Sequence, residues 1–177
     1  MKPQGPYPKS CGVNYKGPTG EQVLSKELTG GNPDIRYLTA MQTFYPGMPI
    51  SREQLLEVAH KAEQGDEGAI MALGKTYYEI GHHYTNCSVV RTGQNWLKRG
   101  SDMNLPHAKV ALSQHYFSGI CGPIQLDKAL SLAREAYALD QHPIIKEWLD
   151  YANDPANQKL AVTQREKEFR AYKGEPS

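Results

Sequence analysis

Apolar and polar residues alternate at helical spacing from residue 51 to about residue 153, and this pattern predicts a series of short helices. The first of them starts at Ser51, which has Gln54 three residues later, the spacing of a capping box. Gly65 is a stop signal for the same helix. Its apolar residues share one face: Leu55, Val58, Ala59 and Ala62. Strand signals are nearly absent from this stretch, so we expect an all-α fold.

The middle of the chain matches itself under a constant shift, which is the strongest signal in the sequence. Residues 69–78, AIMALGKTYY, meet residues 108–117, AKVALSQHYF, after a shift of 39 positions. A further shift of 36 carries the pattern to HPIIKEWLDYA, where Trp148 takes the place of Leu112. Each pair of short helices is too small to bury its apolar face alone, so the copies must stack. We therefore assign Trp148 and the earlier Trp96 to the core.

The second copy reads LSQHYFSGICGPIQLDKALSLAREAYALD, in which an L-x-x-x-Y-x-x-G segment and a Gly-containing loop precede Asp-Lys-Ala. This pattern resembles the Sel-like repeat, a relative of the tetratricopeptide repeat. The residues that match it in order are Leu112, Tyr116, Gly119, Gly122, Asp127, Lys128 and Ala129. The first copy departs from the family, because its loop is longer and lacks Asp-Lys-Ala. The resemblance implies a short α/α solenoid of two to three repeats over residues 51–153.

Two flanking segments differ in composition from the repeat region. Residues 1–50 hold most of the prolines and glycines, which disfavour long helices because Pro lacks an N–H and Gly costs backbone entropy. We expect an irregular arm there, with short helices at residues 21–28 and 34–44. Residues 154–177 are polar, and we expect a C-terminal capping helix that lies on the last repeat and frays after Lys173, with a free solvated helix as the alternative. Its thin apolar stripe consists of Leu160, Val162, Phe169 and Tyr172.

Charge and composition argue against several classes of protein. The chain has 20 Lys and Arg against 19 Asp and Glu, so no strong electrostatic field favours a nucleic acid or a membrane surface. No segment has the length and apolar character of a membrane-spanning helix. The N-terminus, MKPQGPYPKSCG, has no hydrophobic stretch, so we expect a cytoplasmic protein, or a periplasmic one if a signal peptide has been removed. No P-loop, dinucleotide-binding glycine pattern, HExxH or GxSxG motif is present in the sequence.

The Sel-like resemblance implies protein binding without a cofactor. Small stand-alone bacterial members of that family often act as adaptors, and some resemble immunity proteins that hold a toxin or secreted effector inactive. We therefore expect a non-enzymatic interaction module whose partner is another protein. Two alternatives stay open: a metal- or thiol-dependent enzyme that uses a His/Cys-rich loop, and a structural subunit of an envelope or secretion assembly.

The surface expected to bind the partner is the concave side formed by the first helix of each copy. Equivalent positions at i, i+4 and i+7 form one stripe on each helix. The residues of the three stripes are Met71, Lys75, Tyr78, Val110, Gln114, Phe117, Lys146, Asp150 and Asn153. Tyr78 and Phe117 occupy the same place in consecutive copies, and aromatic residues are favoured anchors in interfaces. Burial of these two rings in the core between repeats is the alternative.

The segment GHHYTNC places two histidines and a cysteine close together in the sequence. The candidate ligands for a metal site are His82, His83, Cys87, His115 and Cys121. Zinc prefers four ligands with short paired spacings, and HHxxxC is not a common pairing, so we favour a binding loop in which His82, His83 and Tyr84 face a partner. Cys87 and Cys121 fall in corresponding loops of adjacent copies. They are candidates for a disulfide in an oxidising compartment, whereas both are expected to be thiols in the cytoplasm.

Overall fold

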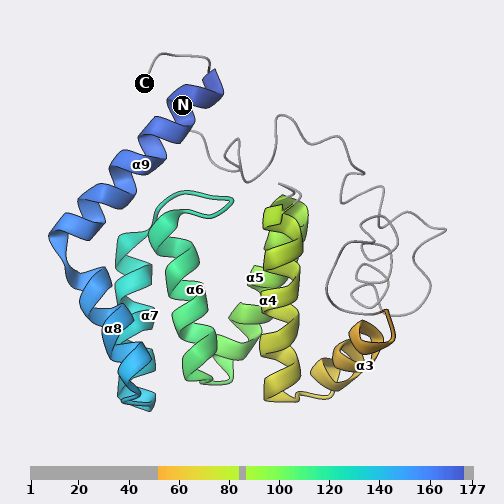
Figure 1. Ribbon diagram of the computed structural model, residues 1–177. Coiled ribbons are helices and arrows are strands. Elements are labelled where there is room, and N and C mark those ends of the chain that lie inside the picture. Colours follow the sequence, from red (N-terminus) through yellow and green to blue (C-terminus); the bar gives the residue numbers. More distant parts are fainter. Residues whose placement is uncertain (1–51, 84–86, 174–177) are drawn as a thin grey trace. The chain divides into compact units, whose positions relative to one another are not determined.

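The computed structural model describes residues 52–83 and 87–173, and every element of these residues is a helix (Figure 1). This confirms the predicted all-α class for the described part of the chain. The helices predicted at residues 21–28 and 34–44, and the capping box at Ser51, lie outside it.

The described helices follow one another with short connections. In chain order they are α3 (Arg52–Glu63), α4 (Glu67–His83), α5 (Cys87–Asp102), α6 (Pro106–Ser118), α7 (Leu126–Leu139), α8 (Pro143–Asn153) and α9 (Pro155–Lys173). They divide into two compact units, one that ends at Trp96 and one that begins at Leu97, so α5 contributes to both. Each unit is described separately.

In the first unit, α3 ends and α4 begins within one tight turn. Gly65 has a φ of 88°, a conformation that glycine adopts without steric cost. The N–H of Gly65 donates to the carbonyl of Ala62, and the N–H of Asp66 donates to that of Lys61, which is the hydrogen-bond pattern of a Schellman motif. The carboxylate of Asp66 then accepts the N–H of Ala69 at 2.8 Å and caps α4. The predicted helix stop at Gly65 is therefore confirmed.

The first unit also contains a very close approach between α4 and α5, at Gly93. A Cβ atom placed on Gly93 would lie 2.7 Å from the carbonyl oxygen of Gly74, 2.9 Å from Cβ of Tyr77 and 3.0 Å from the backbone nitrogen of Tyr78. Only glycine leaves room for this approach, because two of the three neighbouring atoms belong to the backbone of α4. Tyr77 and the predicted core residue Trp96 are both buried.

Proline sets the starts of three helices in the second unit. Pro106, Pro143 and Pro155 are the first residues of α6, α8 and α9, a position where the missing N–H of proline has no cost. The preceding residue caps two of these helices. Nδ1 of His142 accepts the N–H of Ile144 at 3.2 Å, and Oδ1 of Asp154 accepts that of Ala156 at 2.9 Å.

The core of the second unit lies between α6, α7 and α8, which are neighbours in Figure 1. One cluster contains Val110, Ala136 and Ile145, and a second contains Phe117, Ala129 and Ala152. Trp148 packs against both clusters, which agrees with its predicted core position. Its Nε1–H donates to Oγ of the buried Ser113 at 2.8 Å, and this hydroxyl donates to the carbonyl of Ala129 at 2.6 Å. One serine thus links three helices.

One position that the sequence aligns is buried in all three of the helices α4, α6 and α8. The shifts of 39 and 36 relate Ile70, Lys109 and Ile145, and all three side chains are buried. Lys109 is 6% exposed, and its ammonium group is satisfied by Glu135 at 3.0 Å and Ser101 at 3.3 Å. A buried cation needs such partners, because leaving it unpaired would be strongly unfavourable.

The close helix approaches recur at aligned positions as well. Gly74 and Gly93 meet between α4 and α5. Ser113 lies 39 residues after Gly74, and Ala129 lies 36 residues after Gly93, the shift that aligns α5 with α7. Ser113 and Ala129 meet between α6 and α7.

The last helix, α9, contacts α8 and α6. Leu160 is 61% exposed and Val162 is exposed as well, and the side chains of Phe169 and Tyr172 lie outside the described residues. The small side chain of Ala161 packs against the Phe117 cluster instead. Leu160 and Val162 are exposed because a neighbouring face of α9, with Ala161 and Arg165, makes the contact.

Candidate functional site

An exposed apolar face on α8 is the most distinctive surface of the second unit. It consists of Ile144, Trp148 and Tyr151, which are spaced i, i+4 and i+7 and therefore share one side of the helix. Ile144 is 60% exposed and Tyr151 is 44% exposed, whereas Trp148 is half-buried. We call these three residues the α8 apolar face. Large apolar side chains that are exposed together are typical of interaction sites.

Aromatic packing holds this face in place. The rings of Trp148 and Tyr151 stack with their centroids 5.6 Å apart and an interplanar angle of 24°. The buried ring of Phe117 supports both of them, at 5.3 Å from Trp148 and 5.8 Å from Tyr151. Such pairs add to the stabilisation from burial. Trp148 and Tyr151 therefore rest on the core and have little freedom to rearrange.

The exposure of this face is particular to α8. The aligned positions in α6 are Ala108, Leu112 and His115, and all three are buried. The same helical face is thus buried in α6 and partly exposed in α8.

Charged residues border the α8 apolar face. Glu147 is exposed and, within the described residues, takes part in no ion pair. Lys146 instead binds Asp150, with 2.6 Å from Nζ to each carboxylate oxygen. The hydrogen bond with Asp150 raises the pKa of the Lys146 ammonium group above its ordinary value. Lys146 and Asp150 satisfy each other, whereas the Glu147 carboxylate is open to a partner.

The residues of the three predicted partner-binding stripes differ in their exposure. On α6, Val110 and Phe117 are buried, at 7% and 2% exposure, so the expectation that they lie on an exposed surface is wrong. Phe117 belongs to the core, which was the alternative for this ring. The remaining predicted residues keep some exposure: Gln114, Lys75, Lys146, Asp150 and Asn153 are exposed, and Met71 and Tyr78 are half-buried.

The GHHYTNC segment is more helical than predicted. α4 continues through His83, so His82 and His83 end a helix and do not belong to a loop. Gly81 is the only helix-disfavouring glycine or proline near this end, and one helical glycine costs only about 1 kcal/mol relative to alanine. Cys87 opens α5, and Tyr84 lies outside the described residues, as do the side chains of both histidines.

The described cysteines, Cys87 and Cys121, are both buried and both disulfide-bonded. Cys121 lies in the loop between α6 and α7, as predicted, with a φ of 53°. A disulfide-bonded sulfur is not a thiolate, so neither residue is a nucleophile or a metal ligand in this state. Among the residues that the structure describes, no three His, Cys, Asp or Glu side chains are grouped closely enough to hold a metal ion.

A bond between Cys87 and Cys121 stays a prediction from the sequence. Peptide mapping without reductant is expected to find the peptides of Cys87 and Cys121 cross-linked, with Cys11 as the one cysteine that reacts with an alkylating agent. Three alkylated cysteines in the oxidised native protein would contradict this pairing.

His115 is 6% exposed, and burial lowers the pKa of its imidazole to about 4. The sequence offered this histidine as a candidate metal ligand, whereas the structure buries its side chain. The imidazole is therefore uncharged in the folded protein at neutral pH.

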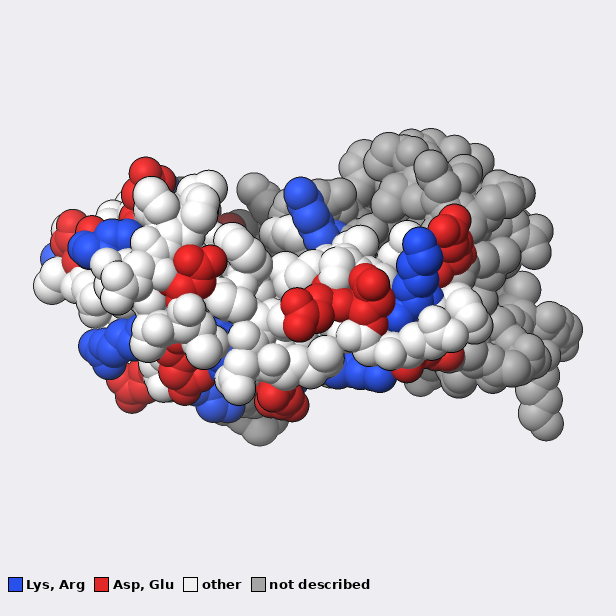
Figure 2. Space-filling view, turned by 90° about the horizontal axis from the view of Figure 1, so that it is seen from below, with Lys and Arg blue, Asp and Glu red and all other residues white. Residues whose placement is uncertain are grey.

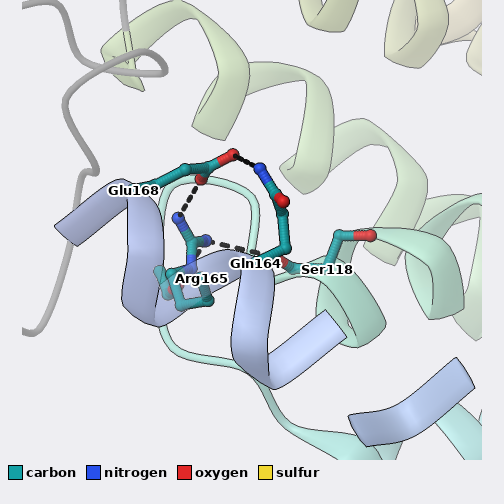
Figure 3. A network of polar contacts seen from close by, with 5 residues as sticks. Ser118, Gln164, Arg165 and Glu168 are labelled. Carbon is teal, nitrogen blue, oxygen red and sulfur yellow. Dashed lines mark hydrogen bonds and ion pairs between the residues drawn. The ribbon is translucent and has the colours of Figure 1, made fainter. Parts of the chain in front are cut away.

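Arg165 fixes α9 to the end of α6 (Figure 3). Its guanidinium group donates to the carbonyls of Ser118, at 3.1 Å, and Gly122, at 3.3 Å. These acceptors lie at the C-terminal end of α6 and in the following loop, where a cation is favoured by the helix dipole. Glu168 accepts from Arg165 at 3.4 Å and from Gln164 at 3.2 Å, which orients the guanidinium group. No apolar pattern in the sequence points to this contact.

Replacing Arg165 by glutamine is expected to loosen α9 without unfolding the other helices. The substitution removes charge-assisted hydrogen bonds, which typically contribute about 1.5–3 kcal/mol. Amide hydrogen exchange measured by mass spectrometry should become faster in residues 160–173 and stay unchanged in α7. Arg170→Gln is the matched control, because Arg170 is an exposed arginine on the same helix. Equal exchange in the two variants would show that Arg165 does not hold α9.

Comparisons with protein-family models, with curated proteins and with solved structures find no match to this chain. None of the described helices has the length and apolar character needed to cross a membrane. On the face drawn in Figure 2, acidic and basic residues are interspersed among uncharged ones, and neither sign covers it. This distribution agrees with the net charge of +1.

Proposed function

We propose that the chain is a non-enzymatic protein–protein interaction module whose partner binds the α8 apolar face. The observation that carries this proposal is the exposure of Ile144 and Tyr151 beside the ring of Trp148. Aromatic and large aliphatic residues that rest on a rigid core contribute strongly to binding energy, because they lose little side-chain entropy on association. The core beneath this face includes Phe117, so the surface is already formed before a partner arrives.

The proposal includes an arrangement of the helices as Sel-like repeats. It is supported by the shared burial of Ile70, Lys109 and Ile145, and by the recurring close approach at Gly93 and Ala129. Through the resemblance, the narrower role proposed is that of an adaptor or an immunity protein that holds a toxin or secreted effector inactive.

Affinity capture with paired variants tests the function. The full chain is used as bait in native lysate, together with a variant that carries Ile144→Ser and Tyr151→Ser. Both residues are largely exposed, so circular dichroism should show unchanged helicity. The expected result is a protein captured by the native chain and lost with the double variant.

The matched control changes one polar residue of the same helix, Asp150. Asp150→Asn lies on the originally predicted stripe and leaves the α8 apolar face intact. If the variant Ile144→Ser with Tyr151→Ser still captures the protein and Asp150→Asn does not, the partner binds the polar stripe of α8. Capture that neither variant affects would exclude α8 as the binding surface. The identity of the captured protein separates a toxin antagonist from a subunit of a larger assembly.

A further inference from the structure

We infer that the segment bound at the α8 apolar face presents a lysine or arginine to Glu147, flanked by apolar side chains that contact Ile144 and Tyr151. This inference rests on the proposed function and adds the chemistry of the partner. It is carried by the position of one acidic residue, Glu147, at the edge of the α8 apolar face.

Glu147 lies on the same side of α8 as the apolar face. Ile144, Glu147 and Tyr151 are spaced i, i+3 and i+7, so the carboxylate falls between the two exposed apolar side chains. Any partner that covers Ile144 and Tyr151 also removes water from Glu147. A carboxylate that loses its water without gaining a cation is strongly unfavourable, so the partner must supply the cation.

No described residue of the second unit already supplies that cation. Among the described residues Glu147 has no ion pair, whereas the neighbouring Lys146 is engaged with both oxygens of Asp150. Asp154 is a further exposed carboxylate near the C-terminal end of α8, whereas Lys146 already neutralises Asp150. A basic partner is therefore attracted, and an acidic one is repelled.

The dimensions of the face suit a short amphipathic segment. Tyr151 is seven positions after Ile144, which corresponds to about 10 Å along a helix that rises 1.5 Å per residue. Two turns of a partner helix, with apolar residues on either side of one Lys or Arg, cover that length.

Other occupants fit this face less well. In a symmetric dimer a two-fold axis through the middle of the face would bring the two Glu147 carboxylates together, which is repulsive. Anionic lipid headgroups and nucleic-acid phosphates would be repelled by the carboxylates of Glu147 and Asp154. A basic protein segment satisfies both the apolar and the acidic groups.

Selection from a random peptide display library tests the inference with the full chain as target. A parallel selection uses Glu147→Lys, and Glu166→Lys is the control, because Glu166 is an exposed glutamate on α9. Peptides selected on the native chain should combine Lys or Arg with apolar residues. Their affinity should fall at least about tenfold on Glu147→Lys and stay unchanged on Glu166→Lys. Peptides selected on Glu147→Lys should carry Asp or Glu instead.

The double variant Ile144→Ser with Tyr151→Ser separates failure of this inference from failure of the proposed function. If selected peptides lose binding to the double variant but bind Glu147→Lys as well as the native chain, the apolar face is the site and the pairing with Glu147 is refuted. If peptides bind the double variant as tightly as the native chain, or none is enriched on the native chain, the binding role of this face is refuted as well.

Discussion

Replacing Gly93 by alanine is expected to lower the free energy of unfolding by about 2 kcal/mol, although alanine is the better helix former. The added Cβ would lie 2.7 Å from the carbonyl oxygen of Gly74 and 3.0 Å from the backbone nitrogen of Tyr78. Neither backbone atom can move without shifting α4. Overpacking of this kind costs up to about 3 kcal/mol, and the gain in helix propensity offsets about 1 kcal/mol of it. Urea denaturation followed by circular dichroism measures the difference.

The control for Gly93 is the same substitution elsewhere in the first unit. Gly68 lies in the first turn of α4, is exposed, and would place its Cβ 3.5 Å from Oδ1 of Asp66, an ordinary contact. Gly68→Ala should therefore raise the free energy of unfolding by as much as about 1 kcal/mol. If Gly93→Ala were as stable as Gly68→Ala, α4 and α5 would not be in close contact at Gly93.

The sequence predicts the existence of the helices well, because local signals that need no tertiary context delimit them. Gly65 ends α3 with a left-handed conformation, and Pro143 starts α8 at the position where proline is tolerated. The internal match also places Ile70, Lys109 and Ile145 correctly in register with one another.

Which face of each helix is exposed could not be predicted in the same way. The aligned residues Val110 and Lys146 have the same place in their helices, yet one is buried and the other is solvated. α6 and α8 each contact α7, α9 and one another, but α6 packs more extensively against α7 than α8 does. The alignment of the copies does not show which neighbouring helix covers each of them. For this reason the predicted exposure of Val110 and Phe117 was wrong.

The docking of α9 shows a second limit of apolar patterns. Leu160 and Val162 are the large apolar side chains, but the surface that α9 meets includes the carbonyls of Ser118 and Gly122. Such acceptors need a donor, so Arg165 makes the contact and the larger apolar residues stay exposed. A charged residue can thus fix a helix whose apolar stripe predicts a different orientation.

Acidification is expected to destabilise the protein through His115, by about 3 kcal/mol between pH 7 and pH 4. Burial lowers the pKa of this imidazole from 6.5 to about 4 in the folded protein. Between these two values the unfolded chain binds a proton at His115 and the folded chain does not, so the free energy of unfolding falls as the pH falls. Below about pH 4 both states are protonated at this residue, and the loss is complete.

Substitution of His115 isolates this contribution from the other groups that titrate in acid. About 2 kcal/mol of the loss should appear by pH 5, where most carboxylates are still ionised. The fall in unfolding free energy from pH 7 to pH 5 should therefore be about 2 kcal/mol smaller in His115→Leu than in the native chain, whatever the cost of the substitution at pH 7. The native pH dependence, measured in the same experiment, is the reference. If the unfolding free energy of His115→Leu had the native pH dependence, His115 would be accessible to protons in the folded protein. The packing around α6 would then be looser than described.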